Sequence, residues 1–239
     1  GELPGLVVYL DVAGNVTTYV RGVADRATES PMSADALFRT ASNGKLLLGT
    51  LSAILANEGT LDLDAPVAPH LDPSVVAHLA NGSTITMRQL LEHRSGLPDF
   101  TDSESFESAV RADPTHEWSD AEAVSFAYDT PATFAPGTGY AYSNTGYCVA
   151  SLVLGHVTGA HPSVAVRSRI LVPFGMESTY WENHEAFDEA RLVHGYEDVE
   201  GDSSVDDVRG YELISGLGAV GYELALRAAA HHLAKNKDQ

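Results

Sequence analysis

The 239-residue sequence has one cysteine, few basic side chains and no long apolar run. The single cysteine, Cys148, excludes an internal disulfide, and its place in an apolar stretch with helical spacing predicts a small buried side chain. Lys and Arg together number 14 against 33 Asp and Glu, which gives a formal net charge of -19. Such a surface repels nucleic acid and anionic membranes, so we expect neither as a partner. The lack of a long apolar run predicts no membrane span.

Several motifs of common hydrolases and metalloproteins are also absent. Neither H-E-x-x-H nor a cysteine pair occurs, so we expect no metal and no cofactor. No G-x-S-x-G elbow occurs, which argues against an α/β-hydrolase. No basic segment with an apolar core follows Gly1, so we expect that a signal peptide has been removed or never existed. The acidic surface suits high salt, where screening removes self-repulsion, and salt adaptation is a hypothesis.

The expected elements place strands near the two ends of the chain and helices between them. Residues 6–12 and 16–20 are rich in β-branched side chains and flank Gly14-Asn15, which predicts a hairpin. The acidic run 197–207 is expected to be an exposed loop. Helical spacing and capping signals predict helices within 42–59, 86–91, parts of 101–129, 147–158, 162–171 and 223–235.

This order predicts an α+β fold in which a helical region is inserted between sheet-forming termini. We expect residues 1–40 to form an N-terminal hairpin of the α/β part. Residues 41–210 are expected to form a mainly helical region that carries the candidate motifs. Residues 211–239 are expected to form a C-terminal segment and helix that return to the α/β part.

The candidate nucleophile is a serine at the start of the helix expected over 42–59. Ser42 and Lys45 are three residues apart and therefore share one face of the first turn. The positive end of the helix dipole stabilises an oxyanion there, and a neutral amine one turn away can take the hydroxyl proton. The alternative is a serine N-cap followed by a solvated lysine, because S-x-x-K arises by chance about once in a chain of this size.

A second candidate group is Tyr142-Ser143-Asn144, at the exit of a loop rich in glycine. A lysine beside a tyrosine favours the anionic phenol, so Tyr142 could shuttle the serine proton. Asn144 carries an amide whose two ends can hold a substrate amide and the lysine ammonium. The alternative is a turn tyrosine followed by a helix-capping Ser or Asn.

Taken together, the two motifs resemble those of the penicillin-recognising serine hydrolases. The branch in question contains class C β-lactamases, D,D-carboxypeptidases and family VIII esterases, in which Y-x-N replaces the S-D-N motif that accompanies S-x-x-K elsewhere in the superfamily. The resemblance extends from about residue 3 to 219 and follows the family order. It rests on GVADRATESPMSADALFRTASNGK, ILANEGTLDLDAPV, ITMRQLLEHRSGLPDF and PGTGYAYSNTGY.

The resemblance implies a β-lactamase/transpeptidase-like fold and a serine hydrolase that acts through an acyl-enzyme on an amide or ester. It implies that Ser42 is acylated, that Lys45 assists as base and that Tyr142 relays the proton to and from the leaving group. Asn144 would orient the acyl chain, and the backbone N–H of Ser42 would supply one oxyanion donor. The segment 93–97 resembles a structural segment of the family. Relatives of this branch are commonly exported, which implies a periplasmic or secreted location.

The sequence departs from the family at its third motif. No K-T-G or H-x-G is present after the helical region, although 214–220 resembles the stretch that precedes that motif. We therefore expect C-terminal sheet strands to be missing or shortened, and a homo-oligomer could complete the sheet. The loss of one oxyanion donor typically costs about 10²–10³ in rate. The alternative function is a catalytically silent binding protein with the same fold.

Two further points stay open in the sequence. Residues 216–221 match G-x-G-x-x-G, but a dinucleotide site needs a following strand with an acidic residue, so a glycine-rich turn is the better interpretation. The substrate is a small molecule or peptide, and β-lactams, D-amino-acid peptides and simple esters are all compatible with the resemblance.

Overall fold

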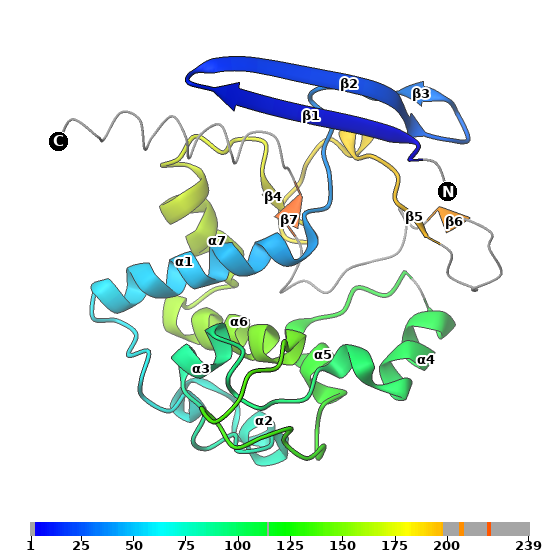
Figure 1. The fold of residues 1–239 in the computed structure, drawn as a ribbon. Helices are drawn as coiled ribbons and strands as arrows, with labels where there is room; N and C mark the ends of the chain where they lie inside the picture. Colours follow the sequence, from blue (N-terminus) through cyan, green and yellow to red (C-terminus); the bar gives the residue numbers. More distant parts are fainter. Residues whose placement is uncertain (1–2, 114, 198–205, 208–218, 221–239) are drawn as a thin grey trace. The chain divides into compact units, whose positions relative to one another are not determined.

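Figure 1 shows a computed structural model of the protein, which describes residues 3–113, 115–197, 206–207 and 219–220. The chain forms two compact units. The described part of unit 1 comes from 3–40, 174–197, 206–207 and 219–220. The described part of unit 2 comes from 41–113 and 115–173. Strands lie in unit 1 and the helices α1 to α7 lie in unit 2, so the predicted α+β class is confirmed.

Unit 1 begins with the predicted hairpin, in which β1 (Gly5–Val12) pairs antiparallel with β2 (Asn15–Asp25) (Figure 1). Val12 pairs with Asn15, so the loop consists of Ala13 and Gly14, with φ angles of 52° and 84°. Two positive φ angles are what a tight hairpin turn of matching twist requires. The turn therefore lies one residue earlier than the Gly14-Asn15 signal indicated. A short strand, β3 (Ser30–Pro31), pairs with the other edge of β2.

The rest of unit 1 consists of short strand pairs and loops. β4 (Tyr180–Trp181) pairs with β7 (Ala219–Val220), and β5 (Tyr196–Glu197) pairs with β6 (Asp206–Asp207), both antiparallel. The ends of the acidic run 197–207 are therefore short strands, which corrects the expectation of a loop throughout. The middle of that run, 198–205, lies outside the described residues.

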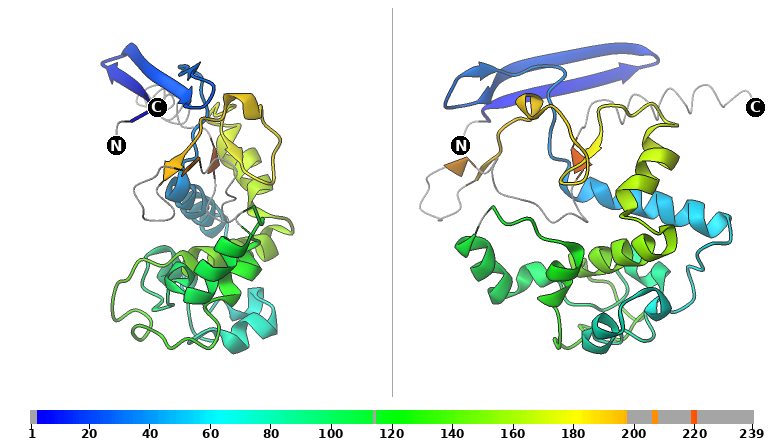
Figure 2. Two further views of the ribbon diagram at one scale, coloured as in Figure 1. Left: turned by 90° about the vertical axis from the view of Figure 1, so that its right-hand side faces the viewer. Right: turned by 180° about the vertical axis from the view of Figure 1, so that it is seen from behind.

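Unit 2 is built around the central helix α6, which packs against α1, α3, α5 and α7 (Figure 2). Cys148 on α6 has no exposed surface, as its apolar surroundings predicted. A single turn of π-helix, Arg167–Leu171, continues α7. The helices are α1 (Gly44–Asn57), α2 (Pro73–His78), α3 (Met87–Leu91), α4 (Glu104–Ala112), α5 (Asp120–Ser125), α6 (Asn144–Thr158) and α7 (Pro162–Val166).

The ends of these helices follow the capping signals of the sequence. Thr86 accepts the backbone N–H of Gln89 and begins α3 with a reciprocal capping box, and Ser119 does the same for α5. Gly59 has φ of +73° after α1, and Gly159 has φ of 76° after α6. The N–H groups of Gly59 and Thr60 donate to the last turn of α1, as a left-handed glycine cap requires. Of the two threonines that the sequence offered as a cap, Thr84 and Thr86, Thr86 begins α3, and the boundaries predicted at Gly59, Ser119 and Gly159 are confirmed.

Several expectations for the C-terminal region lie outside the described residues. They are the helix over 223–235 and the segment 211–218 before the absent third motif. The glycine-rich stretch 216–221 is described only at Ala219 and Val220, which form β7. The division of the chain into parts 1–40, 41–210 and 211–239 stays a prediction.

Candidate active site

Ser42 and Lys45 lie where the chain enters α1. Ser42 belongs to a 3₁₀ turn, Ala41–Asn43, and α1 begins at Gly44, so the serine precedes the α-helix by two residues rather than lying within its first turn. Ala41 has φ of 45°, a left-handed conformation that costs a residue with a side chain about 1–3 kcal/mol. The backbone is thus strained directly before the candidate nucleophile.

Lys45 lies on the buried side of α1. The apolar stripe of this helix, with Leu48 and Leu51 fully buried, faces the interior of unit 2. Lys45 lies in the first turn of the same helix, and only 6% of its surface is exposed. Its Nζ lies 4.9 Å from the ring centroid of Tyr142 and 5.5 Å from that of Tyr147. Two aromatic rings therefore cover the ammonium position.

The structure brings together all four residues that the sequence singled out. Lys45 Nζ donates to Ser42 Oγ at 3.1 Å and to Asn144 Oδ1 at 2.8 Å. The hydroxyls of Ser42 and Tyr142 share a hydrogen bond of 2.7 Å, in which either can be the donor. The Ser42 hydroxyl thus contacts an amine on one side and a phenol on the other. A solvated lysine does not describe this geometry, whereas Ser143 does cap α6, because its Oγ accepts from Gly146 N–H at 3.1 Å.

His93, in the segment 93–97 that was expected to be structural, is bonded to the residues on both sides of Tyr142, and the sequence did not indicate these contacts. The backbone carbonyl of His93 accepts from Ala141 N–H at 3.1 Å, and its Nδ1 accepts from Ser143 N–H at 3.1 Å. Its ring stacks on the Tyr142 ring with centroids 4.4 Å apart. Residues on both sides of Tyr142 are therefore bonded to one histidine, which has a left-handed φ of 56°.

Asp99 holds Asn144 in a similar way. Its Oδ2 accepts from the backbone N–H of Asn144 at 3.0 Å and from the side-chain Nδ2 at 2.9 Å. Its Oδ1 accepts from Thr101 N–H at 3.1 Å. Both His93 and Asp99 fall within the family-like stretch ITMRQLLEHRSGLPDF, in which 93–97 was expected to be structural, but Asp99 had been given no role. The sequence offered no signal for either contact, because each joins residues that are distant along the chain.

Burial and charge shift the pKa of two groups around the site. Burial lowers the pKa of His93, and Lys45 lowers it further, while the Asp99 carboxylate acts in the opposite direction. Burial raises the pKa of Tyr147, whose hydroxyl donates to the backbone carbonyl of Leu91 at 3.0 Å. Neutral forms of both groups are therefore favoured near pH 7.

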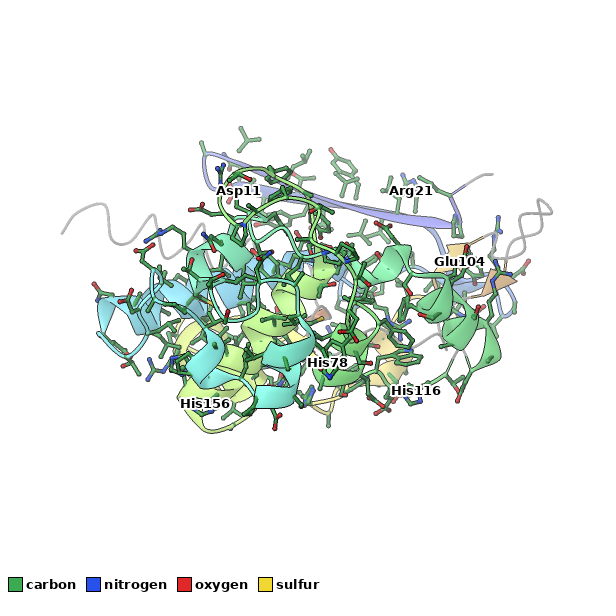
Figure 3. The ribbon with its side chains drawn as sticks, turned by 90° about the horizontal axis from the view of Figure 1, so that it is seen from below. Asp11, Arg21, His78, Glu104, His116 and His156 are labelled. Carbon is green, nitrogen blue, oxygen red and sulfur yellow. The ribbon has the colours of Figure 1, made fainter. Side chains whose placement is uncertain are left out.

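Among the described residues, no group of three or more His, Cys, Asp or Glu side chains could hold a metal ion. Figure 3 shows His78 on α2, His156 on α6 and His116 before α5 at separate places in unit 2. Within the same residues, no single helix has the length and apolarity that a membrane crossing needs. Only α6 and 162–171 taken together pass such a test, and they are bent by 72° at their junction.

Comparison with known structures identifies the fold. The crystal structure of a D-amino acid amidase from Ochrobactrum anthropi SV3 in complex with L-phenylalanine superposes with a TM-score of 0.78 at 30% sequence identity. The superposition covers 98% of this chain and 67% of the amidase. The fold is therefore of the β-lactamase/transpeptidase type, as the resemblance implied.

A family model described as Beta-lactamase matches residues 1–229, and the chain belongs to this family. The chain is 30% identical to penicillin-binding protein 4 of Amycolatopsis lactamdurans over 77% of its own length and 46% of that protein. It is 34% identical to esterase EstB of Burkholderia gladioli over 65% of its own length and 41% of the esterase. The chain thus spans less than half the length of these two relatives.

Proposed function

We propose that the protein is a serine hydrolase that acts on amides or esters through an acyl-enzyme, with Ser42 as the nucleophile. The observation that carries the proposal is the contact of the Ser42 hydroxyl with both Lys45 Nζ, at 3.1 Å, and Tyr142 Oη, at 2.7 Å. A serine hydroxyl is a weak nucleophile unless a neighbouring base removes its proton. Here two such partners lie within hydrogen-bond reach.

In the proposed mechanism, Ser42 Oγ attacks the carbonyl carbon while its proton passes to Lys45 Nζ, which acts as the base. The backbone N–H of Ser42, close to the positive end of α1, holds the oxyanion that develops on the carbonyl oxygen. The bond to the leaving group then breaks: Tyr142 Oη gives its own proton to the departing nitrogen or oxygen, and the proton that Lys45 took from Ser42 passes back to the Tyr142 phenolate. Water hydrolyses the acyl-enzyme by the reverse proton path and restores the Ser42 hydroxyl.

Asn144 has a binding role in this proposal. Its Oδ1 accepts from Lys45 and one Nδ2 hydrogen goes to Asp99, so the second Nδ2 hydrogen is available to a substrate carbonyl. A substrate with an acceptor on the acyl side, such as an acylamino group, fits this donor. Relatives named as an esterase, a penicillin-binding protein and a D-amino acid amidase favour esters, β-lactams and D-amino acid amides as the compounds to test.

Covalent labelling tests the proposal. The protein is incubated with a fluorophosphonate and with a fluorescent penicillin, and the adduct is located by mass spectrometry of peptides. We expect an adduct on Ser42 that is lost in Ser42→Ala and kept in Ser125→Ala, because the exposed Ser125 hydroxyl donates only to the carbonyl of its own helix. An adduct in Ser42→Ala of equal yield would contradict Ser42 as the nucleophile.

Turnover separates the enzyme from a catalytically silent binding protein. We expect release of p-nitrophenol from a p-nitrophenyl ester at a rate that Ser42→Ala abolishes. Folded protein that gives neither an adduct nor turnover, yet binds penicillin in calorimetry, would favour the silent protein. Assembly as a homo-oligomer is part of the same proposal, and light scattering of the purified chain checks it through the mass.

A further inference from the structure

Asn144 is an amide whose two ends have opposite hydrogen-bonding character, and its orientation decides which end faces Lys45. Its Oδ1 accepts from Lys45 Nζ at 2.8 Å, and its Nδ2 donates to Asp99 Oδ2 at 2.9 Å. If the amide turned over, Nδ2 would face the lysine amine and Oδ1 would face the carboxylate. Both contacts would become repulsive, because a donor would face a donor group and an acceptor would face an acceptor.

We propose that Asp99 is a positioning residue that sets the orientation of the Asn144 amide and, through it, the position of Lys45 beside Ser42. The inference rests on the proposed function. Lys45 Nζ donates to Oδ1 and therefore contacts only one end of the amide. A carboxylate can only accept when ionised, so Asp99 admits one orientation of the amide.

The remaining contacts of Asp99 show that its own position is fixed. The same Oδ2 accepts the backbone N–H of Asn144, the first residue of α6, at 3.0 Å, where a negative charge is also favoured by the helix dipole. Oδ1 accepts from Thr101 N–H and begins the 3₁₀ turn Phe100–Asp102. The carboxylate is thus held by both of its oxygens and is not free to follow the amide.

The backbone on either side of Asp99 is also joined to α6. Phe100 N–H donates to Thr145 Oγ1 at 2.9 Å, and the same hydroxyl donates to the carbonyl of Pro98 at 2.7 Å. Phe100 and Thr145 are fully buried. The segment that carries Asp99 therefore moves with the N-terminus of α6, which makes it a rigid reference for the amide. No sequence motif points to this link, because it joins residues 45 positions apart.

A double-mutant cycle separates this role from a general effect on stability. The rate measured is that of Ser42 modification by a fluorophosphonate, in the native chain, Asp99→Ala, Asn144→Ala and the double variant. Since misplacement of a reacting group by about 1 Å can cost about 10²-fold, we expect Asp99→Ala to slow modification by about 10- to 100-fold in the native chain. In the Asn144→Ala background the same change should cost less than about threefold, because the group that Asp99 orients is gone.

Two further variants serve as controls. Asp102→Ala removes a nearby exposed carboxylate that no described contact joins to Asn144, and it should leave the rate unchanged. Asp99→Asn keeps an oxygen that can accept from Asn144, so it should recover part of the rate lost in Asp99→Ala. Equal losses from Asp99→Ala in both backgrounds would overturn the inference. A native chain that is not modified at all would instead contradict the proposed function.

If Asp99→Ala does not fold, an NMR measurement on Asp99→Asn tests the same inference and does not depend on the reaction. The side-chain amide signals of Asn144 can be assigned in an ¹H–¹⁵N spectrum by their loss in Asn144→Ala. In Asp99→Asn one of the two amide protons should shift upfield, because it exchanges a charged acceptor for a neutral one. Unchanged amide signals in Asp99→Asn would overturn the inference, and Asp102→Ala provides the matched control.

Discussion

The phenol oxygen of Tyr142 lies 2.7 Å from Ser42 Oγ, although 100 residues separate the two along the chain. Tyr142 lies at the end of the loop before α6, and Ser42 lies in the 3₁₀ turn before α1. The two helices pack against each other within unit 2, so the starts of two helices bring the hydroxyls together. The contact therefore depends on how well the loop before α6 is held, and His93 and Asp99 hold it.

Removal of the Tyr142 hydroxyl should slow the reaction without preventing substrate binding. General acid–base catalysis contributes about 10²–10⁴-fold, so we expect Tyr142→Phe to lower kcat by a factor in that range with a small change in KM. Steady-state kinetics with a p-nitrophenyl ester measure it. Tyr140→Phe is the matched control, because Tyr140 is exposed and its ring lies 6.0 Å from His93, with no described bond to Ser42. Equal losses in the two variants would contradict a proton-relay role of Tyr142.

Activity should fall on the acid side when His93 becomes protonated. Neutral His93 accepts the Ser143 N–H at Nδ1, and a protonated ring carries a hydrogen there and cannot. Burial and Lys45 lower the pKa of His93, while Asp99 raises it, and the rings of Tyr140, Tyr142 and Tyr147 complete its surroundings. Because the net shift is downward, the contact is complete above the usual histidine value of about 6.5 and is lost as the pH falls through the lowered pKa.

The pH dependence of kcat/KM, compared with that of His93→Gln, checks this prediction. The glutamine Oε1 can accept the Ser143 N–H but does not titrate, so the contribution of residue 93 to the acid limb should disappear. Circular dichroism at each pH distinguishes loss of activity from loss of fold. An acid limb with the same midpoint in His93→Gln would assign the ionisation to another group.

The local parts of this structure follow from local sequence signals, whereas the contacts that complete the site do not. The caps at Thr86, Ser119 and Gly159 are each formed within a few residues, so short motifs predicted them. The contacts of Asp99 with Asn144 and of His93 with Ser143 join residues 45 and 50 positions apart and depend on tertiary packing. The 3₁₀ turn at Ser42 was missed because S-x-x-K has the same spacing in a 3₁₀ turn and in an α-helix.

Cys148 should not react with thiol reagents in the folded protein. The side chain is fully buried on α6, and burial together with the neighbouring Asp120 raises the pKa of its thiol well above the usual range. Reagents such as DTNB attack the thiolate, so both access and ionisation are unfavourable. We expect less than about one tenth of a thiol per chain to react within an hour in buffer, and one thiol per chain in 6 M guanidinium chloride. Rapid modification without denaturant would show that α6 opens readily.

The ion pair between Arg39 and Glu182 should contribute strongly to the stability of unit 1. Arg39 Nε and Nη2 donate to Glu182 at 2.6 to 3.1 Å, and only 7% of Glu182 is exposed. Breaking a buried ion pair by removing one partner typically costs about 3–5 kcal/mol. We therefore expect Glu182→Ala to lower the free energy of unfolding of unit 1 by about this amount.

Trp181 provides a local probe for this measurement. The sequence has 2 tryptophans, and replacement of Trp118 in unit 2 by Phe leaves the buried Trp181 of unit 1 as the sole fluorescent indole. Urea unfolding followed by its fluorescence reports on unit 1 directly. Glu107→Ala is the control, because Glu107 forms an exposed pair with Arg111 on α4, and such pairs contribute only about 0.3–0.5 kcal/mol. Equal shifts in the two variants would contradict this prediction, because the cost of burying the Glu182 carboxylate would then offset its attraction to Arg39.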